Sequence, residues 1–136
     1  MKPFLTSIVV ICFANQIIAQ NLSNLSFGTD STFEVVSWNI EWFPKNGNTS
    51  ANYVQTILTN LNADVYALQE IDDTTLLKQV VANIVGYECF LSSYGGLAYV
   101  YNTNTVQINA KYEIYTSQSY WNAFPRSPQV LDLNFN

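Results

Sequence analysis

The side chains best suited to chemistry in this sequence are Asn39, Glu70 and Arg126. A carboxylate such as Glu70 is a hard oxygen ligand, and one or two carboxylates with waters and a substrate phosphate are enough to hold Mg²⁺. The amide of Asn39 can orient a neighbouring carboxylate or a phosphate oxygen. The guanidinium of Arg126 suits bidentate recognition of a phosphate, with a structural ion pair as the alternative. These residue types suit phosphate chemistry assisted by a metal ion. The residues alone leave two alternatives, an ordinary surface carboxylate at Glu70 and a loop-capping amide at Asn39.

Asn39 and Glu70 each belong to a short apolar run that predicts a buried strand. The runs are Phe33–Pro44 (FEVVSWNIEWFP) and Leu61–Asp72 (LNADVYALQEID). The segment between them has helical spacing, so the unit is predicted to be strand–helix–strand, a crossover that joins parallel strands. The carboxyl ends of parallel strands meet at one edge of a sheet. We therefore expect Asn39 and the Gln69–Glu70 pair to lie close together in the crevice there.

Apolar residues at i, i+3, i+4 and i+7 spacing predict two helices. The first is expected to run from an N-cap at Ser50 to about Leu61, where Asn62 ends it in the left-handed conformation. For the second, one residue of the Asp72–Asp73 pair is expected to be the N-cap, and Gly86 the stop.

Beyond Gly86 the pattern changes to short runs rich in aromatic and β-branched residues, which predict antiparallel hairpins. The predicted strands are Tyr87–Leu91, Leu97–Tyr101, Val106–Ile114 and Gln129–Phe135. A longer loop precedes the last of them and contains Trp121, Phe124 and Arg126.

The N-terminus reads as a secretory signal peptide, with Lys2 as its positive residue and Phe4–Ala14 as its apolar core. This apolar run is shorter than the about 20 residues of a membrane span, and an uncleaved anchor is the alternative. We expect a signal peptide over residues 1–19, a polar linker over 20–32 and a single domain over 33–136. The predicted product is secreted or periplasmic and has no stable membrane span after cleavage.

The composition is that of a globular protein, because 49% of the residues are hydrophobic and 15% are aromatic. The net charge of −5 does not suggest a basic nucleic-acid-binding surface. It does not exclude a nuclease, because a metal ion can offset phosphate charge locally.

After cleavage Cys89 would be the only cysteine, so a packed core rather than a disulfide must stabilise the domain.

The stretches SWNIEWF (37–43) and DVYALQE (64–70) resemble motifs of the endonuclease/exonuclease/phosphatase superfamily, which has the deoxyribonuclease-I-like fold. The resemblance continues through GGLAYVYNTNTV (95–106) and RSPQVLDLNF (126–135). It implies an α/β fold: the N-terminal portion of a four-layer α-β-β-α sandwich. It places Asn39 in the catalytic cluster, makes Glu70 a metal ligand, and matches Arg126 to an Arg-x-Pro motif, which fits a substrate-binding role.

The resemblance implies a metal-dependent phosphodiester hydrolase of the nuclease type, with Mg²⁺ as the ion (Mn²⁺ is possible) and nucleic acid or another phosphodiester as substrate. A phosphatase or phospholipase of the same superfamily, or a non-catalytic secreted binding module, remains an alternative. The superfamily's later motifs contain two histidines and an Asp-x-Asn loop, whereas this sequence contains no histidine. We therefore expect a truncated domain without activity by itself. Substrate, endo- or exo-action and oligomeric state stay open.

Overall fold

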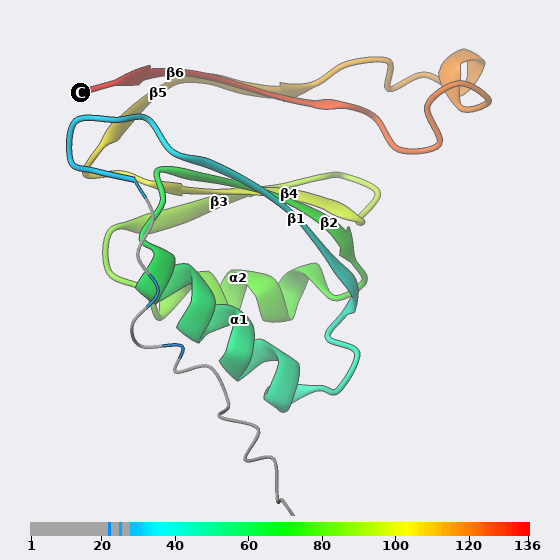
Figure 1. Ribbon diagram of the computed structural model, residues 1–136. Coiled ribbons are helices and arrows are strands. Elements are labelled where there is room, and N and C mark those ends of the chain that lie inside the picture. Colours follow the sequence, from blue (N-terminus) through cyan, green and yellow to red (C-terminus); the bar gives the residue numbers. More distant parts are fainter. Residues whose placement is uncertain (1–21, 23–24, 26–27) are drawn as a thin grey trace, which may run out of the picture.

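The computed structural model describes residues 22, 25 and 28–136. The predicted signal peptide and most of the predicted linker lie outside the described residues. Figure 1 shows three layers: a pair of helices, a four-stranded sheet and a two-stranded sheet. Within the described part of the chain, no helix has the length and apolar character needed to cross a bilayer.

The four-stranded sheet has the strand order β1-β2-β4-β3. Its strands are β1 (Val35–Phe43), β2 (Val65–Ile71), β3 (Tyr87–Leu91) and β4 (Leu97–Asn102). β1 and β2 are parallel, with Asn39 opposite Gln69, whereas β4 is antiparallel to both of its neighbours. The predicted parallel strand–helix–strand unit is thereby confirmed. β1 continues past Asn39 to Phe43, but its register with β2 shifts between these two residues.

The first helix, α1 (Asn48–Leu61), begins earlier than predicted. Ser50 is not its N-cap: Gly47 takes that position with φ 56°, and the Ser50 hydroxyl accepts a hydrogen bond from the backbone N–H of Asn46. A glycine adopts this positive-φ conformation without steric cost, which lets the helix begin three residues sooner. The C-terminal prediction is confirmed, because Asn62 ends the helix with φ 49°.

The second helix, α2 (Thr74–Ala82), is capped by Asp73, whose carboxylate accepts a hydrogen bond from the Leu76 N–H at 2.8 Å. Of the two aspartates proposed as caps, Asp73 is therefore the right one. Gly86 does not stop the helix, which already ends before Asn83. Gly86 instead takes a left-handed conformation (φ 82°) in the turn that leads into β3.

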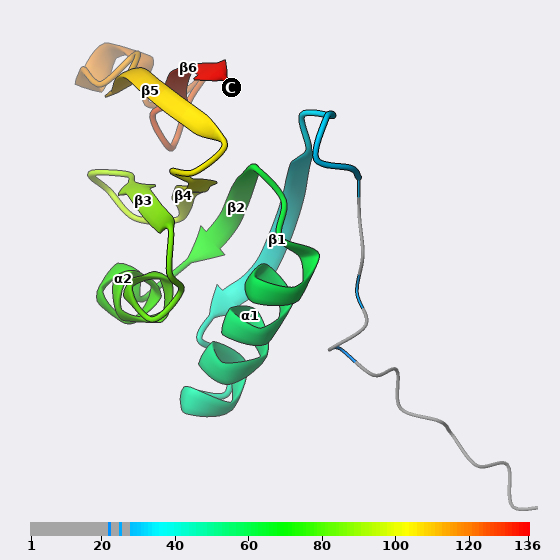
Figure 2. The ribbon, with the colours of Figure 1, turned by 90° about the vertical axis from the view of Figure 1, so that its left-hand side faces the viewer.

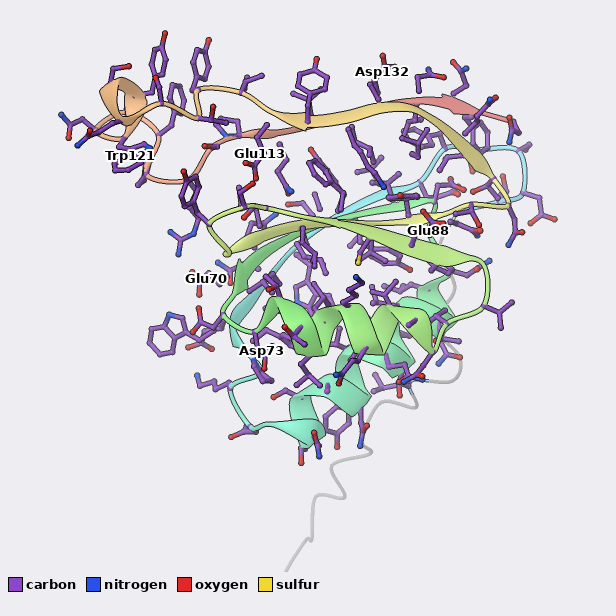
Figure 3. All side chains as sticks on the ribbon, turned by 180° about the vertical axis from the view of Figure 1, so that it is seen from behind. Glu70, Asp73, Glu88, Glu113, Trp121 and Asp132 are labelled. Atoms are coloured by element: carbon purple, nitrogen blue, oxygen red, sulfur yellow. The ribbon has the colours of Figure 1, made fainter. Side chains whose placement is uncertain are left out.

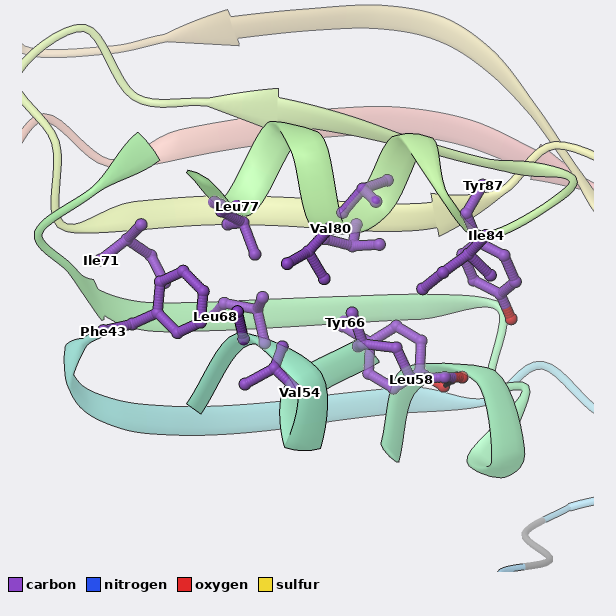
Figure 4. Packing of buried hydrophobic residues seen from close by; sticks show 14 of the residues in the cluster. Phe43, Val54, Leu58, Tyr66, Leu68, Ile71, Leu77, Val80, Ile84 and Tyr87 are labelled. Atoms are coloured by element: carbon purple, nitrogen blue, oxygen red, sulfur yellow. Dashed lines mark hydrogen bonds between the residues drawn. The ribbon is translucent and has the colours of Figure 1, made fainter. Parts of the chain in front are cut away.

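Both helices cover the same face of the four-stranded sheet, as Figure 2 shows. Their apolar stripes and the sheet enclose the main core (Figure 4), which includes Phe43, Leu58, Tyr66, Leu68, Ile71, Leu77 and Val100. Tyr66 is fully buried, and its hydroxyl accepts from the Ala63 N–H at 2.9 Å and donates to the Leu58 carbonyl at 2.8 Å. This pair of bonds fixes the end of α1 to β2.

The opposite face of this sheet is covered by an antiparallel hairpin of β5 (Val106–Glu113) and β6 (Gln129–Phe135). The long connection between them contains a short 3-10 turn at Gln118–Tyr120. The core between the sheets is small: Val65, Tyr101 and Val106 are buried there, with half-buried Tyr99, Ile108, Leu131 and Leu133 around them. The predicted α/β class is confirmed. The described residues form α-β-β layers, and the outer helix layer of the predicted four-layer sandwich is not among them.

Candidate functional site

A cavity of about 260 Å³ opens at the carboxyl ends of β1 and β2. It is lined by Asn39, Trp42, Gln69, Glu70, Asp72, Gly96, Leu97 and Arg126. The structure thus brings together the three residues singled out from the sequence, although they come from β1, β2 and the β5–β6 loop. Glu70 lies at the same end of the two sheets as this loop (Figure 3).

Asn39 and Glu70 are directly linked across the parallel strand pair. The Asn39 Nδ2 group donates to Glu70 Oε1 at 2.8 Å, while Asn39 Oδ1 accepts from the Glu41 N–H at 2.9 Å. The second bond fixes the orientation of the amide, so its donor faces the carboxylate. No described residue hydrogen-bonds the other carboxylate oxygen of Glu70, which remains available to a ligand.

Backbone strain is concentrated around this pair. Glu70 has φ 62°, and Glu41 and Trp42 have φ 40° and 53°, which is the left-handed region that non-glycine residues rarely adopt. Each such residue costs on the order of 1–3 kcal/mol, and such strain clusters at functional sites. The turn at Glu41 and Trp42 also shifts the register of β1 against β2. The strands pair again at Phe43 and Ile71, so β1 contains two extra residues at the edge where the cavity opens.

Arg126 reaches the cavity from the other sheet and packs against Gly96. A Cβ atom added to Gly96 would overlap the Nε atom of Arg126, so the absence of a side chain makes room for the guanidinium. Arg126 is exposed and takes part in no ion pair. The one ion pair among residues 28–136 joins Lys45 to Glu41 at 2.7 Å. The alternative of a structural ion pair is therefore not observed, and the guanidinium is free to bind an anion.

Sequence reasoning missed Asp72 as a site residue. We expected it to be a possible helix cap, but Asp73 performs this role and Asp72 lines the cavity beside Glu70. The Asp72 N–H donates to the Phe43 carbonyl at 3.0 Å, which fixes the backbone at the end of β2. The available signal was a second acidic residue two positions after Glu70.

The donor set of the cavity fits a hard divalent cation. Two carboxylates, Glu70 and Asp72, provide oxygen ligands, and Mg²⁺ keeps several waters and uses one or two carboxylates. The described residues contain no cluster of three or more His, Cys, Asp or Glu side chains, so they do not form a complete protein cage. Such a site would take Mg²⁺ together with water and a phosphate oxygen.

A larger cavity, of about 680 Å³, lies elsewhere, between β3 and β5. Its ionisable groups are paired with one another: the Tyr101 hydroxyl donates to Glu88 at 3.0 Å, and Lys111 Nζ donates to the Tyr101 oxygen at 3.1 Å. Burial raises the pKa of Tyr101, and the hydrogen bond to Tyr101 raises the pKa of Lys111. Because these groups are already paired and none of the predicted site residues is present, we assign the candidate site to the smaller cavity.

No family model matches the sequence, and no curated protein matches it. Among solved structures, the fold is similar to that of humanised D. rerio TDP2 carrying 14 mutations, with a TM-score of 0.60 and 20% sequence identity. The similarity covers 75% of this chain and 44% of the TDP2 chain, so the present chain spans less than half of the length of that structure. At this identity the likeness shows the fold alone: an α/β architecture shared with a deoxyribonuclease-I-like protein.

Proposed function

We propose that this chain supplies the metal- and phosphate-binding part of a phosphodiester hydrolase of the nuclease type, with Mg²⁺ as its ion and Mn²⁺ as a substitute. The observation that carries the proposal is the convergence of Asn39, Glu70 and Arg126 on one cavity. The deoxyribonuclease-I-like fold shared with TDP2 supports it, as does the resemblance of the SWNIEWF and DVYALQE stretches to superfamily motifs.

Each residue has a distinct role in this proposal. Glu70, with Asp72 beside it, would hold the cation, which would supply positive charge that neutralises the phosphate. Asn39 holds one Glu70 oxygen by its hydrogen bond and so keeps the other directed to the ligand. The exposed guanidinium of Arg126 would donate to two phosphate oxygens at once, a geometry that favours Arg over Lys.

We infer that the described site suits phosphate binding but lacks a group that would activate the attacking water. Hydrolysis requires a general base for the attacking water, and an imidazole is the commonest choice. The sequence has no histidine. We propose that the base and the leaving-group acid belong to a further part of the domain, so that these 136 residues bind metal and phosphate without cleaving. We also propose export to the cell exterior or periplasm, on the strength of the signal-peptide pattern in residues 1–19.

Calorimetric titration of Mg²⁺ and Mn²⁺ into the chain tests the proposal. Glu70→Gln keeps the shape but removes the charge, and it should abolish metal binding. Glu41→Gln is the matched control, because Glu41 pairs with Lys45 and does not line the cavity, so this variant should bind as the wild type does. Unchanged metal affinity in Glu70→Gln, with circular dichroism showing an intact fold, would remove Glu70 as a ligand.

A plasmid-nicking assay tests the second part of the proposal. We expect no metal-dependent nicking by the pure chain, because the described site lacks a base. Nicking that depends on Mg²⁺ and disappears in Glu70→Ala would show that the chain contains its own catalytic base. No metal or phosphate binding at all, in an intact fold, would exclude both the hydrolase and a binding module that uses this cavity.

A further inference from the structure

Five exposed aromatic side chains gather beside the candidate site. They are Tyr94, Tyr115, Tyr120, Trp121 and Phe124, here called the aromatic platform, and each is at least 36% exposed. Tyr94 comes from the β3–β4 turn and the others from the β5–β6 loop. Solvent-exposed aromatic residues that cluster in this way are uncommon on a surface without a binding role.

The platform is ordered by contacts among its own rings. Tyr115 stacks on Phe124 with ring centroids 4.8 Å apart and 5° between the planes, and Tyr120 lies 4.9 Å from Tyr115. Tyr94 and Trp121 form an edge-to-face pair with centroids 6.2 Å apart. In such a pair the ring that presents its edge keeps both of its faces uncovered by its partner. Tyr94 and Trp121 are 64% and 46% exposed, so flat ring surface is available to a ligand.

The platform is continuous with the phosphate-binding side of the cavity. The Tyr94–Trp121 contact joins the β3–β4 turn to the β5–β6 loop. The packing of Arg126 on Gly96 joins the same two segments. Glu113 also accepts a hydrogen bond from the Ser93 N–H at 2.7 Å, which attaches the β3–β4 turn to β5. Figure 3 shows Trp121 and Glu70 at the same end of the sheets, away from Glu88 and Asp132.

The segment that carries four of the five platform residues has a positive charge. Residues 114–131 contain no Asp or Glu and carry Arg126, in a chain whose net charge is −5. A ligand that placed a phosphate at Arg126 and a flat ring on the platform would meet no carboxylate of that segment. Glu113 lies close by, since it accepts a hydrogen bond from the Ser93 N–H next to Tyr94. Glu70 and Asp72 line the cavity with Arg126, where the proposed cation would offset their charge. A membrane surface fits less well, because this segment offers one basic residue only and binding to anionic lipid grows with the number of Lys and Arg side chains.

We propose that Tyr94 and Trp121 form a base-binding subsite, on which an unpaired base adjacent to the phosphate at Arg126 stacks. The substrate class is therefore single-stranded nucleic acid. Duplex bases are covered on both faces by their neighbours, whereas unpaired bases stack readily on aromatic side chains. The inference rests on the proposed function, since it takes the phosphate position from Arg126.

The test is fluorescence anisotropy with a labelled oligothymidylate of about ten nucleotides, a length within the usual site size of single-strand binders. The second probe is an oligomer with the same number of phosphates and no bases. Trp121→Ala and Tyr94→Ala should each weaken binding of the oligothymidylate by about tenfold, the usual effect of removing a stacking side chain. Neither variant should change binding of the baseless oligomer. Trp121→Phe should keep most of the affinity, because a phenyl ring still stacks.

Tyr53→Ala is the matched control, because Tyr53 is 59% exposed on α1, in the helix layer that covers the opposite face of the sheet. It should bind both oligomers as the wild type does. Aromatic variants that bind oligothymidylate normally, or that lose both oligomers equally, would overturn the base-binding subsite. So would a wild-type chain that does not bind oligothymidylate. Loss of binding to phosphatidylcholine–phosphatidylglycerol vesicles, with unchanged oligothymidylate binding, would assign the platform to a membrane and overturn the proposal.

Arg126→Gln separates this inference from the proposed function. Weaker binding of both oligomers by Arg126→Gln, with normal binding by the aromatic variants, would retain the phosphate site and reject the base subsite. Weaker oligothymidylate binding by the aromatic variants alone would support the base subsite and reject the phosphate role of Arg126. Metal titration of Glu70→Gln tests the cation site independently of both.

Discussion

The guanidinium of Arg126 occupies the space that a side chain at Gly96 would need. This contact joins the β5–β6 loop to the residue before β4, and it brings the cation of Arg126 to the cavity that Glu70 and Asp72 also line. The position of Arg126 therefore depends on the absence of a Cβ atom at Gly96. A single methyl group at residue 96 should be enough to displace it.

Gly96→Ala should weaken the binding of inorganic phosphate in the presence of Mg²⁺, because the new methyl group overlaps Arg126. Gly95→Ala is a matched control: Gly95 also has a left-handed φ (73°), but a Cβ there would meet only the Ile71 carbonyl oxygen, at 3.7 Å. Both substitutions should lower the free energy of unfolding by about 1–2 kcal/mol, because both force a left-handed alanine. Equal phosphate affinities in the two variants would show that Gly96 does not position Arg126.

Asn39→Asp should make stability depend on pH and on metal. The new carboxylate would face Glu70 at the present hydrogen-bond distance of 2.8 Å. Two carboxylates in contact raise the pKa of one of them above its unfolded value of about 4. The variant should then match Asn39→Ala below about pH 4, and lose about 1 kcal/mol relative to it as the pH rises toward neutral. Thermal unfolding between pH 4 and pH 8 measures this.

Mg²⁺ should restore the stability of Asn39→Asp near neutral pH, because a divalent ion relieves repulsion between carboxylates. Asn39→Ala provides the comparison, since it loses the hydrogen bond without gaining a charge. A difference between the two variants that does not change with pH would mean that the Glu70 carboxylate can turn away from residue 39.

Tyr66→Phe should lower the free energy of unfolding in urea by about 1–3 kcal/mol, the cost of leaving a buried polar group without a partner. The Ala63 N–H would lose its acceptor, whereas the Leu58 carbonyl would keep a hydrogen bond from the Asn62 N–H at 3.2 Å. Tyr53→Phe, on the exposed face of α1, should change stability by less than about 0.5 kcal/mol. Metal affinity should be unaffected in both variants. An unchanged free energy of unfolding in Tyr66→Phe would indicate that the turn after α1 adjusts to the loss of this hydrogen bond.

Cys89 should react slowly with iodoacetamide in the folded chain. Burial raises the pKa of its thiol, with smaller opposing effects of Lys78 and Lys111, so less thiolate is present at pH 8 than in an unfolded chain. A Cys12→Ser chain leaves Cys89 as the single cysteine. The pH at which its reaction rate rises should be higher in buffer, where the chain is folded, than in urea. Because the folded pKa is raised, unfolding releases a proton above about pH 8.5, and stability should fall there. Coincident rate profiles would show that the thiol is accessible in the fold.

Much of the fold could be predicted because local patterns specify it. The apolar runs at Val35–Phe43 and Val65–Ile71 determine the parallel strand pair, and the helical spacing between them determines the crossover. The predicted start of α1 was wrong because two residues that can begin a helix, Gly47 and Ser50, lie within four positions of each other. Which one becomes the cap depends on the path of the preceding turn, and residue preferences alone do not determine that path.

The site could be predicted in part, for a different reason. Asn39 and Glu70 come together because the two strands are parallel, and that follows from the crossover. The left-handed backbone at Glu70 could not be predicted, since a glutamate gives no sign of adopting it. Asp72 was missed because the choice of cap between two adjacent aspartates decides which carboxylate is left for a ligand. The contact of Arg126 with Gly96 depends on packing between sheets, which local sequence does not encode.

The two sheets differ in the size of the core that stabilises them, and this difference affects the dynamics of the site. The four-stranded sheet packs against the two helices through a large core, whereas the β5–β6 hairpin packs on it through a small one, with Val65, Tyr101 and Val106 as its buried residues. A segment with so few buried contacts opens at a lower free energy than the rest of the chain, and its amides exchange with solvent sooner. Each opening would carry Arg126 and Trp121 away while Glu70 stays in place. Observed affinity would then be the intrinsic affinity multiplied by the docked fraction, and a bound nucleotide would slow amide exchange in β5 and β6 but not in β2.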